Sequence, residues 1–443
     1  MTPYGPGADG AGSGAGGEGG LGGTPGAARV LAGLGAVRED VAEWYRDLHA
    51  HPELGFKEHR TAALVAGHLR SWGFTVTEGV GGTGVVGVLA NGPGPAVLLR
   101  AELDALPGVE RTGLPYAATP GPAVPGGEPA MHACGHDVHM ACLLGAARLL
   151  AGAPEVWGGT LVAVFQPSEE NGEGARAMVE GGLAELIPRP EVALAQHVFH
   201  APAGYVGTRQ GPFLSAADTL RIVLHGRGAH GSQPEASVDP VVLAAMVVLR
   251  LQTIVAREIG PAERAVVTVS GVHAGGAAPN AIPESAELTV NIRAFDEDVR
   301  GRVVEAITRM VRAECQASRS PRAPEFERLS AFPPTVNDAA ATARVAASFA
   351  GHFGEDARTA EPLSPSDDFT EISQALGVPA VFWVIGGTGP ERYAAAERAG
   401  TVARDVPVNH SPYFAPVPRP TLDVGVRALV VAALTWLGAG VTR

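Results

Sequence analysis

Cysteine is scarce in this chain, and positive charge is outnumbered by negative charge. Three cysteines in 443 residues, Cys134, Cys142 and Cys315, are too few for a disulfide framework and indicate reduced thiols. The formal net charge of −13 argues against a nucleic acid or an anionic membrane as partner. No run of about 18 uncharged apolar residues occurs, which argues against a membrane span. We therefore expect a cytoplasmic protein with no nucleic-acid or membrane partner.

Apolar side chains are almost absent from the beginning of the chain. Residues 1–26 include 12 glycines, so this segment cannot bury enough surface to offset the entropy lost on ordering. A basic region followed by an apolar run, which is typical of a signal peptide, is also missing. We expect residues 1–27 to form a disordered tail without a catalytic role.

The rest of the chain has the composition of a well-buried globular protein, with 46% apolar and 18% charged residues. Its length favours two domains. Residues 28–212 alternate between helical and strand patterns, which predicts an α/β layer with a largely parallel sheet. Active sites in such sheets lie at the carboxyl ends of the strands. Helices are predicted in the stretches 37–54, where His51-Pro52 stops the helix, 61–74, where Gly73 closes it, 139–150 and 174–182. The predicted strands are 83–90, 96–107 and 159–170.

A second pattern interrupts the first between about 213 and 330. Strand, helix, strand, strand, helix and strand follow one another, which is the ferredoxin-like α+β order. The helices are predicted over 239–258 and 297–317. Helix and strand alternate again over 331–443, so this segment completes the first domain and the second is an insertion.

Polar residues with metal-binding capacity follow the predicted strands. "MHACGHDVHMACLLGAA" contains Cys134 and His136, a pair that alone is more often a buried thiol beside a loop histidine. Glu169 and Glu170 end a buried strand, where adjacent carboxylates repel each other and are costly to desolvate. The alternative is a solvated turn. A cation would offset the repulsion for one carboxylate and leave the other free as a base. His197 and His410 occupy two further strand-end or loop positions, and the coincidence of four such sites favours a metal centre.

Eight stretches between about 45 and 415 stand out, in this order: "DLHAHPELGFKE", "LLRAELDALP", "MHACGHDVHMACLLGAA", "FQPSEENGEGARAMVE", "GRGAHGSQPEASVDPV", "LQTIVARE", "VTVSGVHAGGAAPNAIPESAEL" and "NHSPYF". Together they resemble, in family order, the zinc-dependent aminoacylases and carboxypeptidases. The similarity is strongest to the branch of hippurate hydrolases and plant hydrolases of auxin–amino acid conjugates. The resemblance implies a metal-dependent exopeptidase-type catalytic domain with an inserted ferredoxin-like dimerisation or lid domain.

The resemblance also implies roles for individual residues. Glu169 is the expected catalytic base, and Asp104 is expected to support the metal cluster by orienting an imidazole. His230 is expected to reach the active site of a partner subunit. The expected substrate-binding residues are Asn280 and Arg293. The expected metal ligands are Cys134, His136, Glu170, His197 and His410.

Further histidines near these motifs have simpler interpretations, and the chain departs from the family at several positions, among them Glu102, Ser168 and Asn171. His139 and His200 are expected to support or pack beside the ligands, and His49 is expected to be structural. The stretch "AELDALP" has Glu102 where the family usually has Asp. No predicted ligand and no predicted base is missing, so we expect activity to be retained.

These residues predict an amidohydrolase that uses two divalent cations per chain to cleave the amide bond of N-acyl amino acids. Zn²⁺ is the expected metal, with Mn²⁺, Co²⁺ or Ni²⁺ as alternatives. A dipeptidase or carboxypeptidase on the same site, and a non-catalytic homologue, are the alternative functions. We also expect a homodimer through the inserted domain, because the 239–256 segment is apolar on more sides than a small domain covers.

Overall fold

The computed structural model describes residues 26–118, 128–276 and 278–439. They form two compact units. The first comprises the described residues within 1–211, 336–361 and 368–443, and the second comprises those within 212–335 and 362–367. Most of the predicted tail, residues 1–25, lies outside the described residues, and Ala27 begins helix α1 (Ala27–Leu31). The second unit also includes a short segment, 362–367, that the sequence pattern does not indicate.

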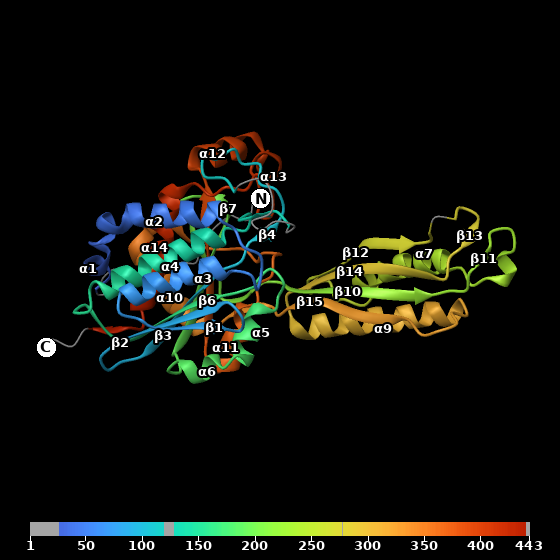
Figure 1. The fold of residues 1–443 in the computed structure, drawn as a ribbon, viewed down its shortest axis with the longest axis horizontal. Coiled ribbons are helices and arrows are strands. Elements are labelled where there is room, and N and C mark those ends of the chain that lie inside the picture. The colour runs from blue at the N-terminus through green and yellow to red at the C-terminus, as the bar shows by residue number, and fades with distance from the viewer. Residues whose placement is uncertain (1–25, 119–127, 277, 440–443) are drawn as a thin grey trace, which may run out of the picture. The chain divides into compact units, whose positions relative to one another are not determined.

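A nine-stranded sheet is the centre of the first unit (Figure 1). The central strands β6, β3, β7 and β18 run parallel to one another. The hairpin β1–β2 and strand β8 run antiparallel to the central neighbours they join, so the sheet is mixed where a largely parallel one was predicted. The predicted α/β fold is confirmed. In spatial order the strands are β1 (Thr75–Val80), β2 (Gly84–Asn91), β6 (Trp157–Gln166), β3 (Ala96–Glu102), β7 (Val192–Pro202), β18 (Ala380–Thr388), β8 (Val206–Thr208) and β17 (Ala357–Thr359), with β19 (Gly438–Ala439) beside β6.

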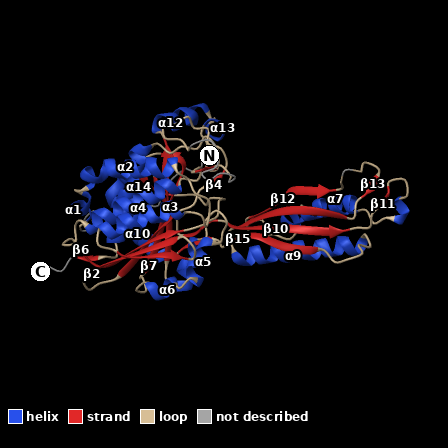
Figure 2. Cartoon of the chain, viewed as in Figure 1, coloured by secondary structure: helices blue, strands red, loops and turns tan. Residues whose placement is uncertain are grey.

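Helices cover both faces of this sheet (Figures 1 and 2). Strand β3 is buried along its whole length, as expected of a strand covered on both faces. One face carries α2 (Leu34–Ala50), α3 (His59–Ser71), α4 (His136–Ala151), α10 (Ala339–Phe353) and α14 (Pro418–Leu434). The other carries α5 (Gly174–Glu180), α6 (Leu183–Leu186) and α11 (Phe369–Leu376), and α12 (Pro390–Ala399) and α13 (Val402–Asp405) follow β18.

Helix α4 is the most deeply buried helix of this layer, and it positions the motif at its start. Every residue from His136 to Ala147 is buried, because the sequence is apolar around the whole circumference after the first turn. Its neighbours are α2 and α14 on one side and strands β3 and β7 on the other. The polar residues at its amino end are thereby held at the carboxyl ends of the parallel strands. A two-stranded ladder of β4 (Leu106–Pro107) and β5 (Ala130–Met131) precedes it.

The second unit is a four-stranded antiparallel sheet in the order β12-β14-β10-β15. Its elements follow the predicted ferredoxin-like order, and the predicted 297–317 helix matches α9. The predicted 239–258 helix is divided at Gln252. Both long helices pack on one face of the sheet, and the strands therefore alternate between buried and less buried side chains. The elements are β10 (Ala216–His225), α7 (Pro240–Leu251), α8 (Thr253–Arg257), β12 (Ala265–Ala274), β14 (Ser285–Ala294), α9 (Glu297–Ala317) and β15 (Glu325–Phe332).

The outer side of α7 is unusually apolar. Val242, Met246 and Leu249 lie at helical spacing and are 59%, 48% and 66% exposed. Within the described ranges one helical stretch, Pro240–Arg257, is long and apolar enough to cross a membrane by length and composition alone, with a mean hydropathy of 1.6 and 33% of it buried. A single such stretch is weak support for a span, and α7 packs on the sheet through Leu243 and Val247.

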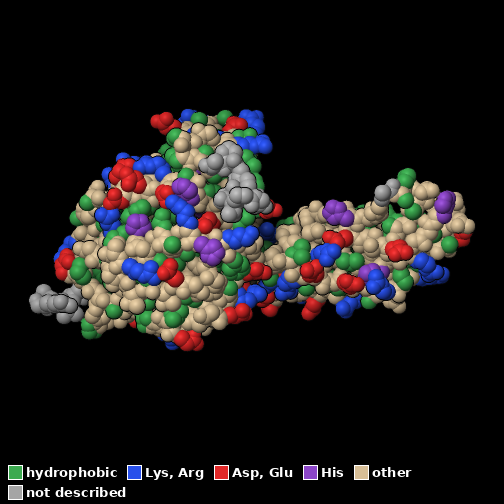
Figure 3. All heavy atoms as spheres, viewed as in Figure 1, with side chains coloured by type: hydrophobic (Ala, Val, Ile, Leu, Met, Phe, Trp, Pro, Cys, Tyr) green, Lys and Arg blue, Asp and Glu red, His purple; other side chains and the backbone are tan. Residues whose placement is uncertain are grey.

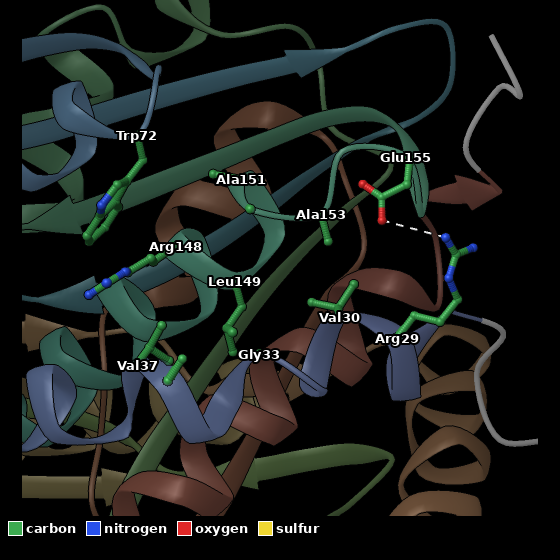
Figure 4. A pocket seen from close by; sticks show the side chains of 12 residues that line it. Arg29, Val30, Gly33, Val37, Trp72, Arg148, Leu149, Ala151, Ala153 and Glu155 are labelled. Atoms are coloured by element: carbon green, nitrogen blue, oxygen red, sulfur yellow. Dashed lines mark ion pairs between the residues drawn. The ribbon is translucent and has the colours of Figure 1, made fainter.

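Two further features concern the surface. Acidic and basic side chains are interspersed over the visible face of each unit (Figure 3). A pocket of about 510 Å³ opens between α1, α2, Trp72 and the end of α4, with the Arg29–Glu155 ion pair at its rim (Figure 4). None of the predicted ligands lines this pocket.

Candidate active site

Seven of the predicted site residues lie together in the first unit, although they come from five separate segments. Asp104 follows β3, the two glutamates follow β6, and His197 belongs to β7. These strands are parallel, so their carboxyl ends meet at one edge of the sheet. The amino end of α4 and the loop before α14 bring the remaining side chains to the same edge. The seven residues are Asp104, Cys134, His136, Glu169, Glu170, His197 and His410.

The ligand-capable atoms of this cluster are close enough to share cations. The Cys134 sulfur lies 3.4 Å from His197 Nε2. His136 Nε2 lies 3.6 Å from Glu169 Oε2 and 3.8 Å from Glu170 Oε1. The same Glu170 oxygen lies 3.4 Å from Nε2 of His410. A nitrogen and a sulfur ligand on one tetrahedral Zn²⁺ would be about 3.5 Å apart, so the Cys134–His197 separation fits a shared cation.

Asp104 connects two of these side chains. Its backbone carbonyl accepts a hydrogen bond from His136 Nδ1 at 2.8 Å, and its carboxylate Oδ1 lies 3.3 Å from the same nitrogen. The other carboxylate oxygen accepts the backbone N–H of Glu170 at 3.0 Å. With its Nδ1 proton held in this way, His136 presents the Nε2 lone pair to the cluster.

The backbone takes uncommon conformations at three positions of the site. Gly135, between Cys134 and His136, has a φ of 94°, and a Cβ there would lie 2.3 Å from a methyl group of Val198. Ser168 has a φ of 47° and His410 a φ of 71°, which side-chain-bearing residues rarely adopt. Each position directly precedes or carries a predicted functional residue. Such backbone strain persists where the surrounding structure enforces it, and it is frequent at functional sites.

The electrostatics of the cluster favour a cation. Burial raises the pKa of the Cys134 thiol well above its usual range, and the charges of Glu170 and Glu169 add to this shift. Burial opposes protonation of His136, but the hydrogen bond to Asp104 and the charge of Glu102 outweigh it and raise its pKa to about 10. A bound cation reverses both effects, because it stabilises a thiolate and competes with the proton on the imidazole.

Buried polar atoms without hydrogen-bond partners also favour a bound cation. Within the described part of the chain, His136 Nε2 and Glu170 Oε1 are buried and make no hydrogen bond. Such atoms cost free energy unless something else satisfies them. One thiol, three imidazoles and carboxylates are a ligand set that suits Zn²⁺ and neighbouring transition metals. The side chains present therefore fit divalent cations.

Two supporting residues were not singled out in the sequence. Glu58 is buried, and its carboxylate accepts the backbone N–H of Ser168 at 2.8 Å, which fixes the turn before Glu169. Asn409 donates to the backbone carbonyls of Cys134 and Val198, each at 3.0 Å. Both lie inside stretches that carry the family resemblance, so the available signal was a polar residue at a fixed place in a motif.

The other three predicted site residues belong to the second unit. His230 and Asn280 are neighbours there, with 3.5 Å between the imidazole Nε2 and the amide nitrogen, and both are exposed. Arg293 is half-buried and donates to Asn291 and Ser366. Burial lowers the pKa of this guanidinium. His230 and Asn280 form one polar group, and Arg293 lies on β14 of the sheet.

The chain is similar to known proteins over much of its length. Residues 98–405 match the peptidase family M20/M25/M40. Thermostable carboxypeptidase 1 of Saccharolobus solfataricus is 34% identical over 359 residues, which cover 79% of this chain and 87% of that protein. Hippurate hydrolase of Campylobacter jejuni is 39% identical over 272 residues, which cover 61% and 68%.

A solved structure supports the same assignment. Bacillus subtilis YXEP, described as a dinuclear metal binding peptidase of family M20, has a TM-score of 0.70 and 27% identity, covering 90% of this chain and 98% of its own. The chain therefore belongs to the peptidase family M20/M25/M40 and is a metal-dependent amidohydrolase.

Proposed function

We propose that this enzyme hydrolyses the amide bond of N-acyl amino acids at the cluster around Cys134 and Glu169, releasing a carboxylic acid and a free amino acid. The observation that carries the proposal is the meeting of a thiol, three imidazoles and two adjacent glutamates at one edge of the sheet. Amides are poor electrophiles, and water at neutral pH is a poor nucleophile. A site that hydrolyses them must therefore supply both activation and a base.

The proposed site holds two divalent cations, with Zn²⁺ as the expected metal. Two ligand groups that share Cys134 support this number: Cys134 with His136 and His197, and Cys134 with Glu170 and His410. The dinuclear description of the Bacillus subtilis protein adds to the support. The mixed sulfur, nitrogen and oxygen ligands favour Zn²⁺, and Mn²⁺, Co²⁺ or Ni²⁺ are the alternatives.

Glu169 is the proposed general base. Its side chain is 6% exposed and groups with His136 and Glu170, but it belongs to neither of the two ligand groups that share Cys134. Bound divalent cations would lower the pKa of a water molecule toward about 7 and polarise the scissile carbonyl. Glu169 takes a proton from the attacking water and returns it to the leaving nitrogen. Asp104 keeps His136 and the Glu170 backbone in place throughout.

The substrate class is supported by the relatives. Hippurate hydrolase is named for an N-acyl amino acid, whereas the Saccharolobus protein is named as a carboxypeptidase. A carboxypeptidase or dipeptidase is therefore the second candidate function on the same site. Asn280 and Arg293 are the proposed contacts for the substrate carbonyl or carboxylate.

A substrate panel tests the proposal. The metal-loaded enzyme should cleave N-acetyl or N-benzoyl amino acids faster than dipeptides, and complete metal removal should abolish the activity. Faster cleavage of dipeptides would favour the second candidate. Hydrolysis that continues undiminished after removal of all metal would refute the metal-dependent assignment itself.

We also propose a homodimer through the second unit, in which His230 completes the active site of the partner subunit. Support comes from the exposed apolar residues Val242, Met246 and Leu249 on α7, which a second copy would cover. His230 is exposed on a short strand of the same unit, where it is available to a neighbouring molecule. In this role it would donate a hydrogen bond to the oxygen that gains negative charge during attack.

Three free, buried cysteines fit a reducing compartment, so the cytoplasm is the proposed location.

A further inference from the structure

The side chain of Asn409 joins three segments that each carry a predicted ligand. Its amide nitrogen lies 3.0 Å from the carbonyl oxygen of Cys134 and 3.0 Å from that of Val198, the residue after His197. The next residue along its own chain is His410, whose backbone N–H donates to the carbonyl of Ala133 at 2.7 Å. One planar NH₂ group thus connects the loop before α4, the middle of β7 and the loop before α14.

The contact with Val198 reaches the imidazole of His197 directly. The carbonyl that receives the Asn409 hydrogen bond also accepts one from His197 Nδ1 at 2.9 Å. An Nδ1 proton held by a carbonyl leaves the Nε2 lone pair free, and Nε2 is the atom that faces the Cys134 sulfur at 3.4 Å. If this carbonyl moved, the ring would lose the partner that sets its orientation and its tautomer.

An amide suits this position because of its hydrogen-bonding capacity. An NH₂ group has two N–H donors, and each can serve one of the two carbonyls. A carboxylate would present an acceptor to two acceptors, and an aliphatic side chain would leave both carbonyls unpaired. Other asparagines of this kind lie outside the site. One of them is Asn91, whose amide donates to the carbonyls of Pro154 and Trp157 at 2.7 and 2.6 Å.

We propose that Asn409 is a positioning residue of the metal centre, which fixes Cys134, His197 and His410 relative to one another through their backbones. The inference rests on the proposed function, because it requires these three side chains to be ligands. Asn409 itself takes no part in proton transfer and binds no metal. Asn409 affects the affinity for the cation and the ligand field. Substitution of a residue that hydrogen-bonds to metal ligands typically lowers the metal affinity 10- to 100-fold.

Cobalt binding to the full chain tests the role. Asn409→Leu removes both donors without adding charge, and Asn91→Leu makes the same change away from the site. Metal-free protein is titrated with Co²⁺ in the presence of a competing chelator, and the visible and near-ultraviolet absorption is recorded. Thermal unfolding of each metal-free variant is measured in parallel. We expect Asn409→Leu to weaken Co²⁺ binding about 10- to 100-fold and to change the absorption spectrum. Asn91→Leu should leave both at wild-type values.

The Co²⁺ titrations distinguish failure of this inference from failure of the proposed function. Wild-type Co²⁺ affinity and spectrum in Asn409→Leu would overturn the inference and leave the proposed function standing. A wild-type spectrum without a thiolate-to-cobalt band would overturn the proposed ligand role of Cys134, and the inference with it. Should metal-free Asn409→Leu be unfolded, Asn409→Ser, which retains one donor, provides the comparison. The Co²⁺ affinity of Asn409→Ser is expected to be lower than that of the wild type. Wild-type affinity in this variant would count against the role of Asn409.

Discussion

His139 Nδ1 lies 2.6 Å from Glu102 Oε2, and both side chains are fully buried beside the candidate metal ligands. On its other edge the His139 ring accepts the backbone N–H of Val198 at 2.8 Å, so its proton resides on Nδ1 and points to the carboxylate. Glu102 is also paired with Arg100, whose guanidinium contacts Asp368 at 3.1 Å. A buried ionic network thereby supports the part of β7 that carries His197.

Glu102→Gln is expected to destabilise the fold strongly. The substitution removes the negative charge of a fully buried pair, so less negative charge remains to balance the buried Arg100 guanidinium. Breaking such a pair typically costs about 3–5 kcal/mol. The control is Glu78→Gln, in the exposed pair with Arg70, which should change stability by about 1 kcal/mol or less. Denaturant unfolding of both variants measures the difference, and similar losses in the two would contradict this account of the network.

Local elements of the fold could be predicted from the sequence, whereas contacts between distant residues could not. The helix over 297–317 was predictable because its apolar spacing and its Asp296 cap are local signals. The contacts of His139 with Val198 and of Asn409 with Cys134 join residues 59 and 275 positions apart, and no local pattern encodes them. The mixed sheet was likewise missed, because strand direction at the edges depends on pairing rather than on composition.

Local sequence patterns alone did not predict the metal ligands. Cys134 and His136 alone favoured a buried thiol and a loop histidine, and the ligand set came from the resemblance to a family. The structure adds that their side chains converge with Glu170 and His197 in space. Their roles as ligands stay predictions until metal is measured.

Glu169→Gln should abolish turnover while the metal content stays near that of the wild type. The amide retains the shape of the side chain but cannot accept the proton, and loss of a general base typically costs 10²-fold or more in rate. Glu170→Gln should instead lower metal content, because Glu170 Oε1 faces both His136 and His410. Metal analysis and kinetics on the two variants decide the assignment: depletion in Glu169→Gln with full occupancy in Glu170→Gln would reverse the roles.

His49 should make stability fall as the pH rises above neutrality. The side chain is 1% exposed and lies 2.6 Å from Asp137 and 3.0 Å from Glu110. Burial opposes its charge, but the hydrogen bonds to these carboxylates outweigh burial and raise its pKa to about 10, from 6.5 as the ordinary value. The contribution is therefore complete below about pH 6.5 and is lost as the pH rises through 10.

His49→Gln isolates this effect. Between pH 6.5 and 10 the folded wild type holds one proton more than the unfolded chain, so this group alone lowers stability by about 1.4 kcal/mol per pH unit. The variant should lack that part of the slope, whatever its absolute stability. Denaturant unfolding of both proteins at pH 6, 8 and 9.5 gives the two slopes, and parallel curves would show that His49 is neutral in the folded state.

His230→Ala should keep the fold and the metal but lose most of kcat, since it removes stabilisation of the developing charge and not the base. Mixed with Glu169→Gln subunits, it should recover part of the activity. In the heterodimer one site combines an intact Glu169 with the partner's intact His230, and the other site lacks both. Recovery requires the dimer, so adding Leu249→Glu to both variants, on the exposed face of α7, should abolish it. If the mixture stays as inactive as its components after subunit exchange has been demonstrated, His230 does not act across the dimer.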